Sequence, residues 1–426
     1  MYSRHPSRRL AGLAGALTAV LLLAACGSGF SGDESPTSGD TGTGGGGGAA
    51  GELTVLIGSS GEAETAAVTA AVDAWAQSTG NTATVRNASN LIQELSQGFA
   101  AGQPPDLFYV TGDQFETLAA NDSLFAYGDQ LGSVSDFFPS LVELFSRDGE
   151  FYCAPKDFST LTLVINTDDW TAAGLTDTDY PTTWNQLAAV AEKLTVDGRV
   201  GLALNSQYER VGVFLAQGGG SMISDDGTTA TVASPENVAA LQYVKDRLNA
   251  GSFAWSSAVG AGWGGEALGT HKASMTIEGN WIAGAMATDY PEINWKAVEL
   301  PGGPGGEGTL QFSTCWGIGT DSPNRDTAVD LAEYLTDTAQ QAEFSKAFGV
   351  MPSVQSAAAA YTQAFPEMRA FIESADFAQN IVTVPGWSAV LNDFNAQLEA
   401  LATGDPQAIL TSVQTNLQAL LDENNA

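Results

Sequence analysis

The sequence has 426 residues, of which 44% are hydrophobic and 9% aromatic, and it carries a formal net charge of −33 at pH 7. This composition is that of a globular protein and excludes a disordered chain. The chain is longer than a domain with a single hydrophobic core usually is, so we expect two lobes. The negative charge repels phosphate, which argues against nucleic-acid binding and against adsorption to anionic lipid.

The N-terminus has the pattern of an export signal. Arginines at positions 4, 8 and 9 precede an apolar run over residues 13–25, as in the first two regions of a signal peptide. The run ends in Leu-Ala-Ala-Cys-Gly, which resembles a bacterial lipobox, so we predict a signal peptide over residues 1–25 and acylation of Cys26. The alternative is a transmembrane anchor, but the run is shorter than the roughly 20 apolar residues that span a bilayer. The predicted location is extracytoplasmic, with the chain anchored to the cell membrane by lipid on Cys26.

The next segment, residues 26–51, is rich in Gly, Ser, Thr and Asp and is predicted to be a flexible tether. From residue 52, short apolar runs rich in branched residues alternate with segments of helical periodicity. The predicted strands are 53–57, 82–86 and 107–110, and the predicted helices are 62–77, 91–101 and 115–120. This alternation is typical of a parallel sheet in an α/β lobe.

The pattern continues through the rest of the chain. Residues 151–165 are predicted to be extended, and the hydroxyls in Pro181-Thr182-Thr183-Trp184 are expected to cap a helix. Further predicted strands are 200–204, 273–277 and 311–318; further helices begin near Pro235 and Pro323, and the chain is mostly helical from about residue 357. The Gly-rich segment 301–308 lacks the Gly-Lys-Ser/Thr of a phosphate-binding loop and is predicted to be a mobile surface loop.

Three cysteines occur, and Cys26 is assigned to the lipobox. In an exported protein the remaining pair, Cys153 and Cys315, is expected to form a disulfide; the alternative is two buried free thiols. The sequence has no CxxC pair and only two histidines, His5 and His271. We therefore expect neither a zinc site nor another cofactor.

Four short motifs occur in the order found in one family of binding proteins. They are Pro105-Asp106-Leu107-Phe108 followed by Gly112-Asp113, Cys153-Ala154-Pro155-Lys156-Asp157 leading to Ile165-Asn166, Pro181-Thr182-Thr183-Trp184, and Ala273-Ser274-Met275 leading to Gly279-Asn280-Trp281. From about Leu53 to its C-terminus the chain resembles the extracellular solute-binding proteins of bacterial ABC importers. The similarity is to the sugar-binding family that includes maltodextrin-binding protein.

The resemblance implies an α/β fold of the periplasmic-binding-protein type. Each of two lobes would hold a mixed, mostly parallel sheet flanked by helices, and hinge strands would cross between them. The implied lobes are 52–153 plus 316–352 and 154–315 plus 353–426, with crossings at 151–155, at 314–318 and near Met351-Pro352-Ser353. A bond between Cys153 and Cys315 would then staple the hinge, since paired strands come within disulfide range.

Sugar recognition needs flat aromatic faces and planar polar groups in a largely preformed cleft. Trp281 matches the family's ligand-binding tryptophan and is the first candidate. Trp387, which follows Pro385-Gly386, and Trp263, set among glycines, are further candidates. For each of the three tryptophans the alternative is a place in the core.

The polar candidates lie after predicted strands, where ligands bind in open α/β sheets. Asp113 matches a family position where an acid often binds sugar hydroxyls, although it is also placed to cap a helix. The other candidates are Glu62, Tyr208, Glu209, Arg210, Glu278, Asn280, Asp157 and Lys156. Lys156 and Asp157 could instead form an ion pair that does not contact ligand. His271 is not included.

The predicted function is capture of a sugar, a di- or oligosaccharide, by a lipid-anchored monomer that closes two lobes over the ligand and delivers it to an ABC permease. No catalytic residue and no metal are predicted, because no Gly-x-Ser-x-Gly motif occurs and histidine is scarce. One alternative is a binding protein for a polyamine or another small solute. The other is a secreted carbohydrate-active enzyme, since the 49 acidic residues could supply a carboxylate pair.

Overall fold

The fold is described from a computed structural model, which covers residues 52–224 and 226–424. The predicted signal peptide, Cys26 and the whole of the predicted tether lie outside these residues. Among these residues, no helix is both long enough and apolar enough to cross a membrane.

The chain begins with a parallel sheet, as predicted. Strand β1 (Glu52–Ile57) lies between β2 (Thr82–Asn87) and β3 (Leu107–Thr111) and pairs in parallel with both. Helix α1 (Glu62–Thr79) connects β1 to β2 and packs Val68, Val72 and Trp75 into the core. It ends at Gly80, whose φ of 79° suits glycine.

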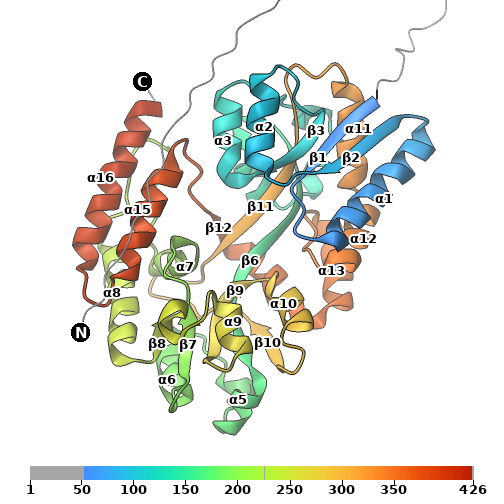
Figure 1. The fold of residues 1–426 in the computed structure, drawn as a ribbon. Helices are drawn as coiled ribbons and strands as arrows, with labels where there is room; N and C mark the ends of the chain where they lie inside the picture. Colours follow the sequence, from blue (N-terminus) through green and yellow to red (C-terminus); the bar gives the residue numbers. More distant parts are fainter. Residues whose placement is uncertain (1–51, 225, 425–426) are drawn as a thin grey trace, which may run out of the picture. The chain divides into compact units, whose positions relative to one another are not determined.

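Two long strands join this first part of the sheet to a second part (Figure 1). Strand β11 (Thr309–Ile318) pairs antiparallel with β3 on one side and with β6 (Ala154–Asn166) on the other. Strand β6 continues into the second part, where it pairs antiparallel with β9 (Ala273–Gly279) and β10 (Trp295–Val298). The described residues thus form a ten-stranded sheet in which two α/β halves share β6 and β11.

The second half adds β7 (Val200–Leu204), which pairs in parallel with β9 and with β8 (Phe253–Trp255). Short strands β4 (Ser146–Arg147) and β5 (Glu150–Phe151) form a hairpin, and β12 (Ala378–Asn380) adds to β11. The remaining helices are α2 (Leu91–Ala100), α3 (Gly112–Ala120), α4 (Pro139–Leu144), α5 (Thr167–Ala172), α6 (Trp184–Leu194), α7 (Tyr208–Gly218), α8 (Pro235–Ala250), α9 (Gly264–Gly269), α10 (Ile282–Thr288), α11 (Arg325–Leu335), α12 (Thr338–Phe348), α13 (Gln355–Ala364), α14 (Arg369–Glu373), α15 (Trp387–Glu399) and α16 (Pro406–Asn424).

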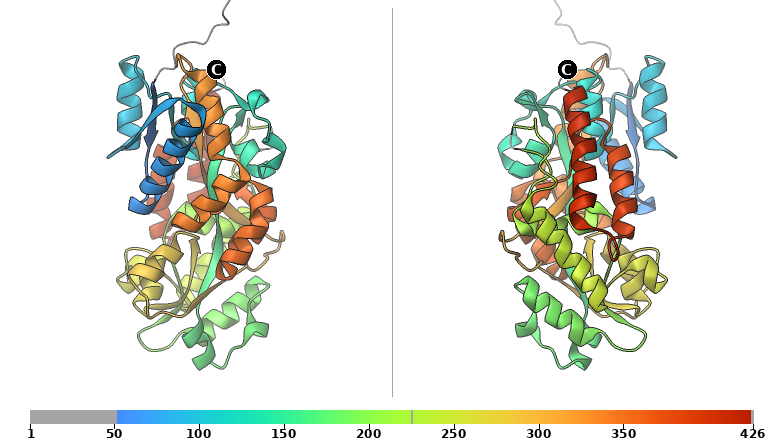
Figure 2. Two further views of the ribbon diagram at one scale, coloured as in Figure 1. Left: turned by 90° about the vertical axis from the view of Figure 1, so that its right-hand side faces the viewer. Right: turned by 90° about the vertical axis from the view of Figure 1, so that its left-hand side faces the viewer.

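Each half has its own hydrophobic core. Helices α1, α11 and α12 cover the first half, and their apolar side chains pack against β1 and β3. The second core lies between β7 and helices α6, α7 and α8. Helices α15 and α16 lie side by side and complete that core, α16 against α8 and α15 against α7 (Figures 1 and 2). The two largest cores of the described residues lie one in each half of the shared sheet, which agrees with the two lobes expected from the chain length.

Most predicted elements match the structure in kind, and the exceptions have local causes. The predicted extended segment 151–165 is interrupted at Tyr152 and Cys153, between β5 and β6. The Gly-rich segment 301–308 packs closely against the end of α7, where the Gly305 amide donates to the Gln217 carbonyl at 2.8 Å. The prediction of a mobile surface loop missed this packing, because glycines also permit close approach of two backbones.

Cys153 and Cys315 are joined by a disulfide in the structure, with their Cα atoms 5.6 Å apart. Both residues are buried in the first core, beside the start of β6. We expect peptide mapping of the unreduced protein to recover one linked peptide pair that contains Cys153 and Cys315. Recovery of both cysteines as alkylated free thiols would contradict the bond.

Candidate functional site

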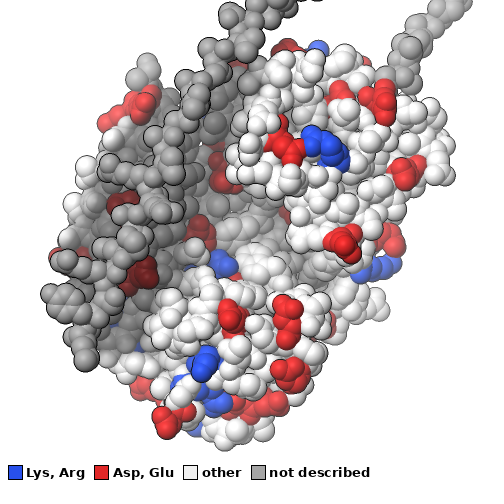
Figure 3. Space-filling model, viewed as in Figure 1, with Lys and Arg blue, Asp and Glu red and all other residues white. Residues whose placement is uncertain are grey.

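A cavity of about 670 Å³ lies where the two halves of the sheet meet along β6 and β11. Its walls come from the N-terminal turn of α1, the end of β3, the turn after β9 and the end of α12. The space-filling view shows this face of the molecule hollowed in its centre (Figure 3). The position is that at which open α/β sheets bind ligands, at the ends of strands.

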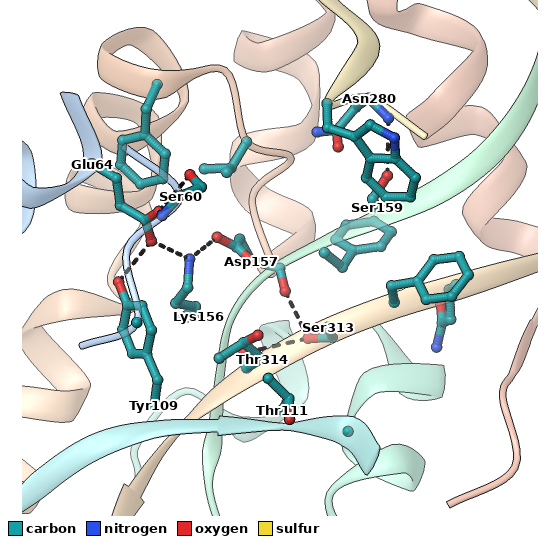
Figure 4. A pocket seen from close by; sticks show the side chains of 18 of the residues that line it. Ser60, Glu64, Tyr109, Thr111, Lys156, Asp157, Ser159, Asn280, Ser313 and Thr314 are labelled. Atoms are coloured by element: carbon teal, nitrogen blue, oxygen red, sulfur yellow. Dashed lines mark hydrogen bonds and ion pairs between the residues drawn. The ribbon is translucent and has the colours of Figure 1, made fainter. Parts of the chain in front are cut away.

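One wall of the cavity carries a buried charged cluster, which we call the Lys156 cluster: Glu64, Tyr109, Lys156 and Asp157. The Nζ of Lys156 lies 2.9 Å from Oε1 of Glu64 and also pairs with the carboxylate of Asp157. The Tyr109 hydroxyl donates to the same Glu64 oxygen at 2.9 Å. Oε2 of Glu64 accepts hydrogen bonds from the backbone and the hydroxyl of Ser60, both at 2.7 Å (Figure 4). The cluster thus holds two carboxylates around one ammonium group.

The surroundings shift the pKa values in this cluster in different directions. Burial raises the pKa of Glu64, but the Lys156 charge and the Ser60 hydrogen bonds outweigh burial and hold this pKa below its ordinary value. Burial lowers the pKa of Lys156, yet the two carboxylates raise it above its ordinary value. For Asp157, burial raises the pKa, Lys156 opposes this, and the net shift is upward. Glu64 is therefore the firmly ionised partner, and Asp157 is the more easily protonated acid.

A β-bulge explains how two successive residues reach one cavity. Thr314 of β11 faces Asp157, whereas Cys315 faces Pro155, so Lys156 is an extra residue in β6. Side chains in an uninterrupted strand alternate between faces, and a bulge re-aims them. Lys156 and Asp157 accordingly both line the cavity and pair with each other.

The opposite wall presents an exposed aromatic ring. Trp281 is 40% exposed, lines the cavity and lies edge-on to Phe312, with ring centroids 5.8 Å apart. Its indole N–H donates to Oε2 of Glu278 at 3.0 Å. Arg210 donates to the same Glu278 oxygen at 2.7 Å and places its guanidinium 5.2 Å from the centre of the Trp281 ring. Glu278, which is fully buried, therefore fixes both the ring and the cation that covers it.

Five of the predicted site residues line this cavity: Trp281, Asn280, Lys156, Asp157 and Asp113. The backbone N–H of Asn280 donates to Ser159 Oγ at 3.0 Å, and its side-chain amide donates to the Gly349 carbonyl at 3.3 Å. Asp113 lies in the first turn of α3 with its side chain exposed. Glu278 and Arg210 lie directly behind Trp281.

The structure places the other candidates elsewhere. Trp387 is 4% exposed and packs edge-on against the buried Tyr208 in the second core, so both serve packing and neither lines the cavity. Trp263 is half-buried beside α9, and its ring lies over Gly265. Glu62 points to solvent at the start of α1, outside the cavity lining. Glu209, half-buried in the first turn of α7, is also absent from that lining.

Several lining residues were not predicted, notably Glu64, Tyr109 and Phe312. The helical periodicity of α1 would have found Glu64, because it lies on the same face as Val68, Ala71 and Trp75, whereas Glu62 does not. Tyr109 lies within an apolar strand, so the sequence pattern predicts a core residue there. Phe312 shows no signal in the sequence beyond its position on a predicted strand.

The comparisons with known proteins agree with this geometry. The sequence profile described as "Bacterial extracellular solute-binding protein" matches residues 70–371. Among solved structures, a cyclic alpha-maltosyl-1,6-maltose binding protein from Arthrobacter globiformis shows 22% identity and a TM-score of 0.79, covering 88% of this chain and 100% of its own. The sugar-binding protein MalE from Xanthomonas citri shows 19% identity and a TM-score of 0.79, covering 88% and 98%. UgpB from Mycobacterium tuberculosis, in complex with glycerophosphocholine, shows 18% identity and a TM-score of 0.74, covering 89% and 100%.

At these identities the solved structures show the fold, a two-lobe α/β binding-protein fold, whereas the profile covers well over half of the chain and shows the family. The chain belongs to the bacterial extracellular solute-binding proteins.

Proposed function

We propose that this protein captures an oligosaccharide in the cavity between its two lobes and delivers it to an ABC permease. The observation that carries the proposal is the exposed ring of Trp281 facing a wall of hydrogen-bonding groups across one cavity. An aromatic face packs against the C–H side of a sugar ring, while carboxylates and hydroxyls bind its hydroxyl groups. The sugar-binding neighbours from Arthrobacter and Xanthomonas, which share the fold, support this choice of ligand.

The first test is a thermal-shift screen of the protein against linear and cyclic oligosaccharides, spermidine and glycerophosphocholine. A ligand that binds only the folded state, present at 100 times its dissociation constant, adds about 2.7 kcal/mol to the free energy of unfolding. We expect an oligosaccharide to raise the melting temperature. A shift from spermidine or glycerophosphocholine, with none from any sugar, would overturn the sugar assignment.

A second ligand class has an observation in its favour. Three carboxylates, those of Glu64, Asp113 and Asp157, line the cavity with one ammonium group, that of Lys156. Such a lining suits a neutral or cationic solute and disfavours an anionic one. A polyamine could also place an ammonium group over Trp281. The spermidine arm of the screen decides between the two classes.

We propose binding without turnover and attachment through lipid on Cys26. The family is one of binding proteins, and the signal and lipobox pattern of the sequence supports the anchor. Chromatography of a bound oligosaccharide after long incubation is expected to recover it intact; cleaved products would support an enzyme. Cys26→Ser is expected to abolish labelling by fatty acid and to release the protein from the membrane.

Asp113→Asn is expected to weaken oligosaccharide binding about fivefold, measured by calorimetry. The side chain lies in the cavity lining, and a hydrogen bond to a charged group is worth about 1 kcal/mol more than one to a neutral group. Because Asp113 is exposed, the melting temperature of the unliganded variant should stay close to that of the wild type. Unchanged affinity would remove Asp113 from the site.

A further inference from the structure

Side chains from three other segments bind backbone carbonyls at the bulge in β6. Ser353 Oγ donates to the carbonyl of Pro155 at 2.6 Å. Gln341 Nε2 donates to the carbonyl of Lys156 at 2.9 Å, and Ser313 Oγ donates to that of Asp157 at 2.6 Å. Three successive carbonyls are thus each held by a separate side chain, at the point where β6 sends Lys156 and Asp157 into the cavity.

Gln341 connects these contacts to the rest of the first lobe. It lies in the first turns of α12, is 1% exposed and stands behind the cavity wall. Its Nε2 also donates to the carbonyl of Leu335 at 3.2 Å, and its Oε1 accepts from the backbone of Ser353 at 2.8 Å. One amide group therefore ties the bulge, the end of α11 and the segment that carries Ser353.

The strand is also fixed on the other side of the bulge. The Tyr127 hydroxyl accepts from the backbone of Ala154 at 2.9 Å and donates to the carbonyl of Trp316 at 2.5 Å. The disulfide holds Cys153, two residues before Pro155, to β11. The disulfide and Tyr127 thus fix β6 just before the bulge, and Gln341 and its neighbours hold the bulge itself.

We infer that Gln341 is a positioning residue of the ligand site: by holding the carbonyl of Lys156, it fixes the bulge that aims Lys156 and Asp157 into the cavity. The inference rests on the proposed function, since it assigns the Lys156 cluster to ligand recognition. Gln341 touches no ligand itself. It acts on the site through the backbone carbonyl of Lys156.

The test compares Gln341→Leu with Gln217→Leu in the full chain. Gln217 is a matched control: it is fully buried in the other core, accepts from Trp184 Nε1 at 2.7 Å and donates to the Gly308 carbonyl at 3.0 Å. Both variants lose buried hydrogen bonds, so both melting temperatures fall. Calorimetry with an oligosaccharide bound by the wild type is expected to show about tenfold weaker binding for Gln341→Leu, and a change within twofold for Gln217→Leu.

A second readout needs no ligand. Carbon-13 NMR of labelled aspartate, assigned with Asp157→Asn, follows the titration of the Asp157 carboxyl. In Gln341→Leu we expect the pKa of Asp157 to rise further, because the bulge relaxes and Lys156 moves away. In Gln217→Leu that pKa should match the wild type. If Gln341→Leu does not fold, Ser353→Ala is the second variant: it removes the hydroxyl that donates to the carbonyl of Pro155 and, at 3.2 Å, to Oε1 of Gln341. It is expected to shift affinity and this pKa in the same directions, by smaller amounts.

The inference is overturned if Gln341→Leu and Gln217→Leu show the same affinity for the oligosaccharide and the same pKa of Asp157. Where Ser353→Ala replaces Gln341→Leu in the test, an Asp157 pKa equal to that of the wild type overturns it. If the wild type binds no oligosaccharide, the proposed function fails. The titration then still decides whether Gln341 positions Asp157.

Discussion

Replacing Lys156 by methionine is expected to lower the free energy of unfolding by about 3–5 kcal/mol at pH 7, the usual cost of breaking a buried ion pair by removing one partner. The ammonium group is the shared partner of Glu64 and Asp157. Methionine has a similar length and leaves the two carboxylates buried against each other. Chemical denaturation at pH 7 measures the loss.

The loss should shrink as the pH falls. In the wild type, the pKa of Glu64 lies below its ordinary value, so this acid stabilises the fold above its unfolded pKa and the stabilisation is lost on acidification. In the variant, burial and mutual repulsion should raise both pKa values above those of the unfolded chain, roughly 3.9 for Asp and 4.3 for Glu. Both acids then favour folding below about pH 4 and oppose it as the pH rises. The difference between wild type and variant is therefore larger at pH 7 than at pH 4.

Lys346→Met is the control for this measurement. Lys346 pairs with Glu343 at 2.8 Å on the surface, where both side chains are largely exposed. An exposed pair contributes about 0–1 kcal/mol, so the same substitution should have little effect at either pH. A loss at Lys156 no larger than that at Lys346, or one independent of pH, would show that the Lys156 cluster is not ionised as described.

The order of elements could be predicted because the signals are local. The apolar runs that became β1, β3 and β9 and the capped starts of α6 and α8 can be read within a few residues. Trp281 and Asn280 could be predicted from their place after one such strand. The exposure of Trp281 follows from the same turn, which starts α10 and leaves the ring outside the core.

The rest of the site depends on pairing between distant segments. The extra residue in β6 is visible only against β11, which lies about 150 residues further along the chain. Without the bulge, successive residues such as Lys156 and Asp157 would be expected on opposite faces. The carbonyl of Lys156 is held by Gln341, whose position in the sequence carries no sign of that role.

The tryptophans show the same limit. Trp387 follows Pro385-Gly386, and Tyr208 follows a strand, as ligand-binding aromatic residues often do. The two rings nevertheless pack against each other in the second core. Whether such a residue faces the cavity depends on how α15 packs on α7, and local sequence does not record that packing. Choosing aromatic residues because they follow a strand therefore finds candidates, but it does not distinguish residues that pack in the core from residues that line the site.

Trp281→Ala is expected to weaken oligosaccharide binding by at least about 30-fold, or about 2 kcal/mol, as for a central aromatic residue in an interface. The substitution removes the exposed face of the cavity wall, leaves the Arg210 guanidinium without its ring and deprives Glu278 of one donor. Because the ring is 40% exposed, the fold should survive with a modest fall in melting temperature. Calorimetry gives the affinity, and circular dichroism reports the fold.

Two further variants separate the ring from its N–H group and from general loss of a tryptophan. Trp281→Phe keeps an aromatic face but cannot donate to Glu278, so its affinity should lie between those of wild type and Trp281→Ala. Trp263→Ala removes a half-buried ring outside the cavity lining and should lower stability without weakening binding. If Trp263→Ala weakens binding as much as Trp281→Ala does, the loss reflects disturbed packing. If Trp281→Ala binds like the wild type, the ligand does not stack on this ring, and the cavity must recognise its solute through the polar wall around Lys156.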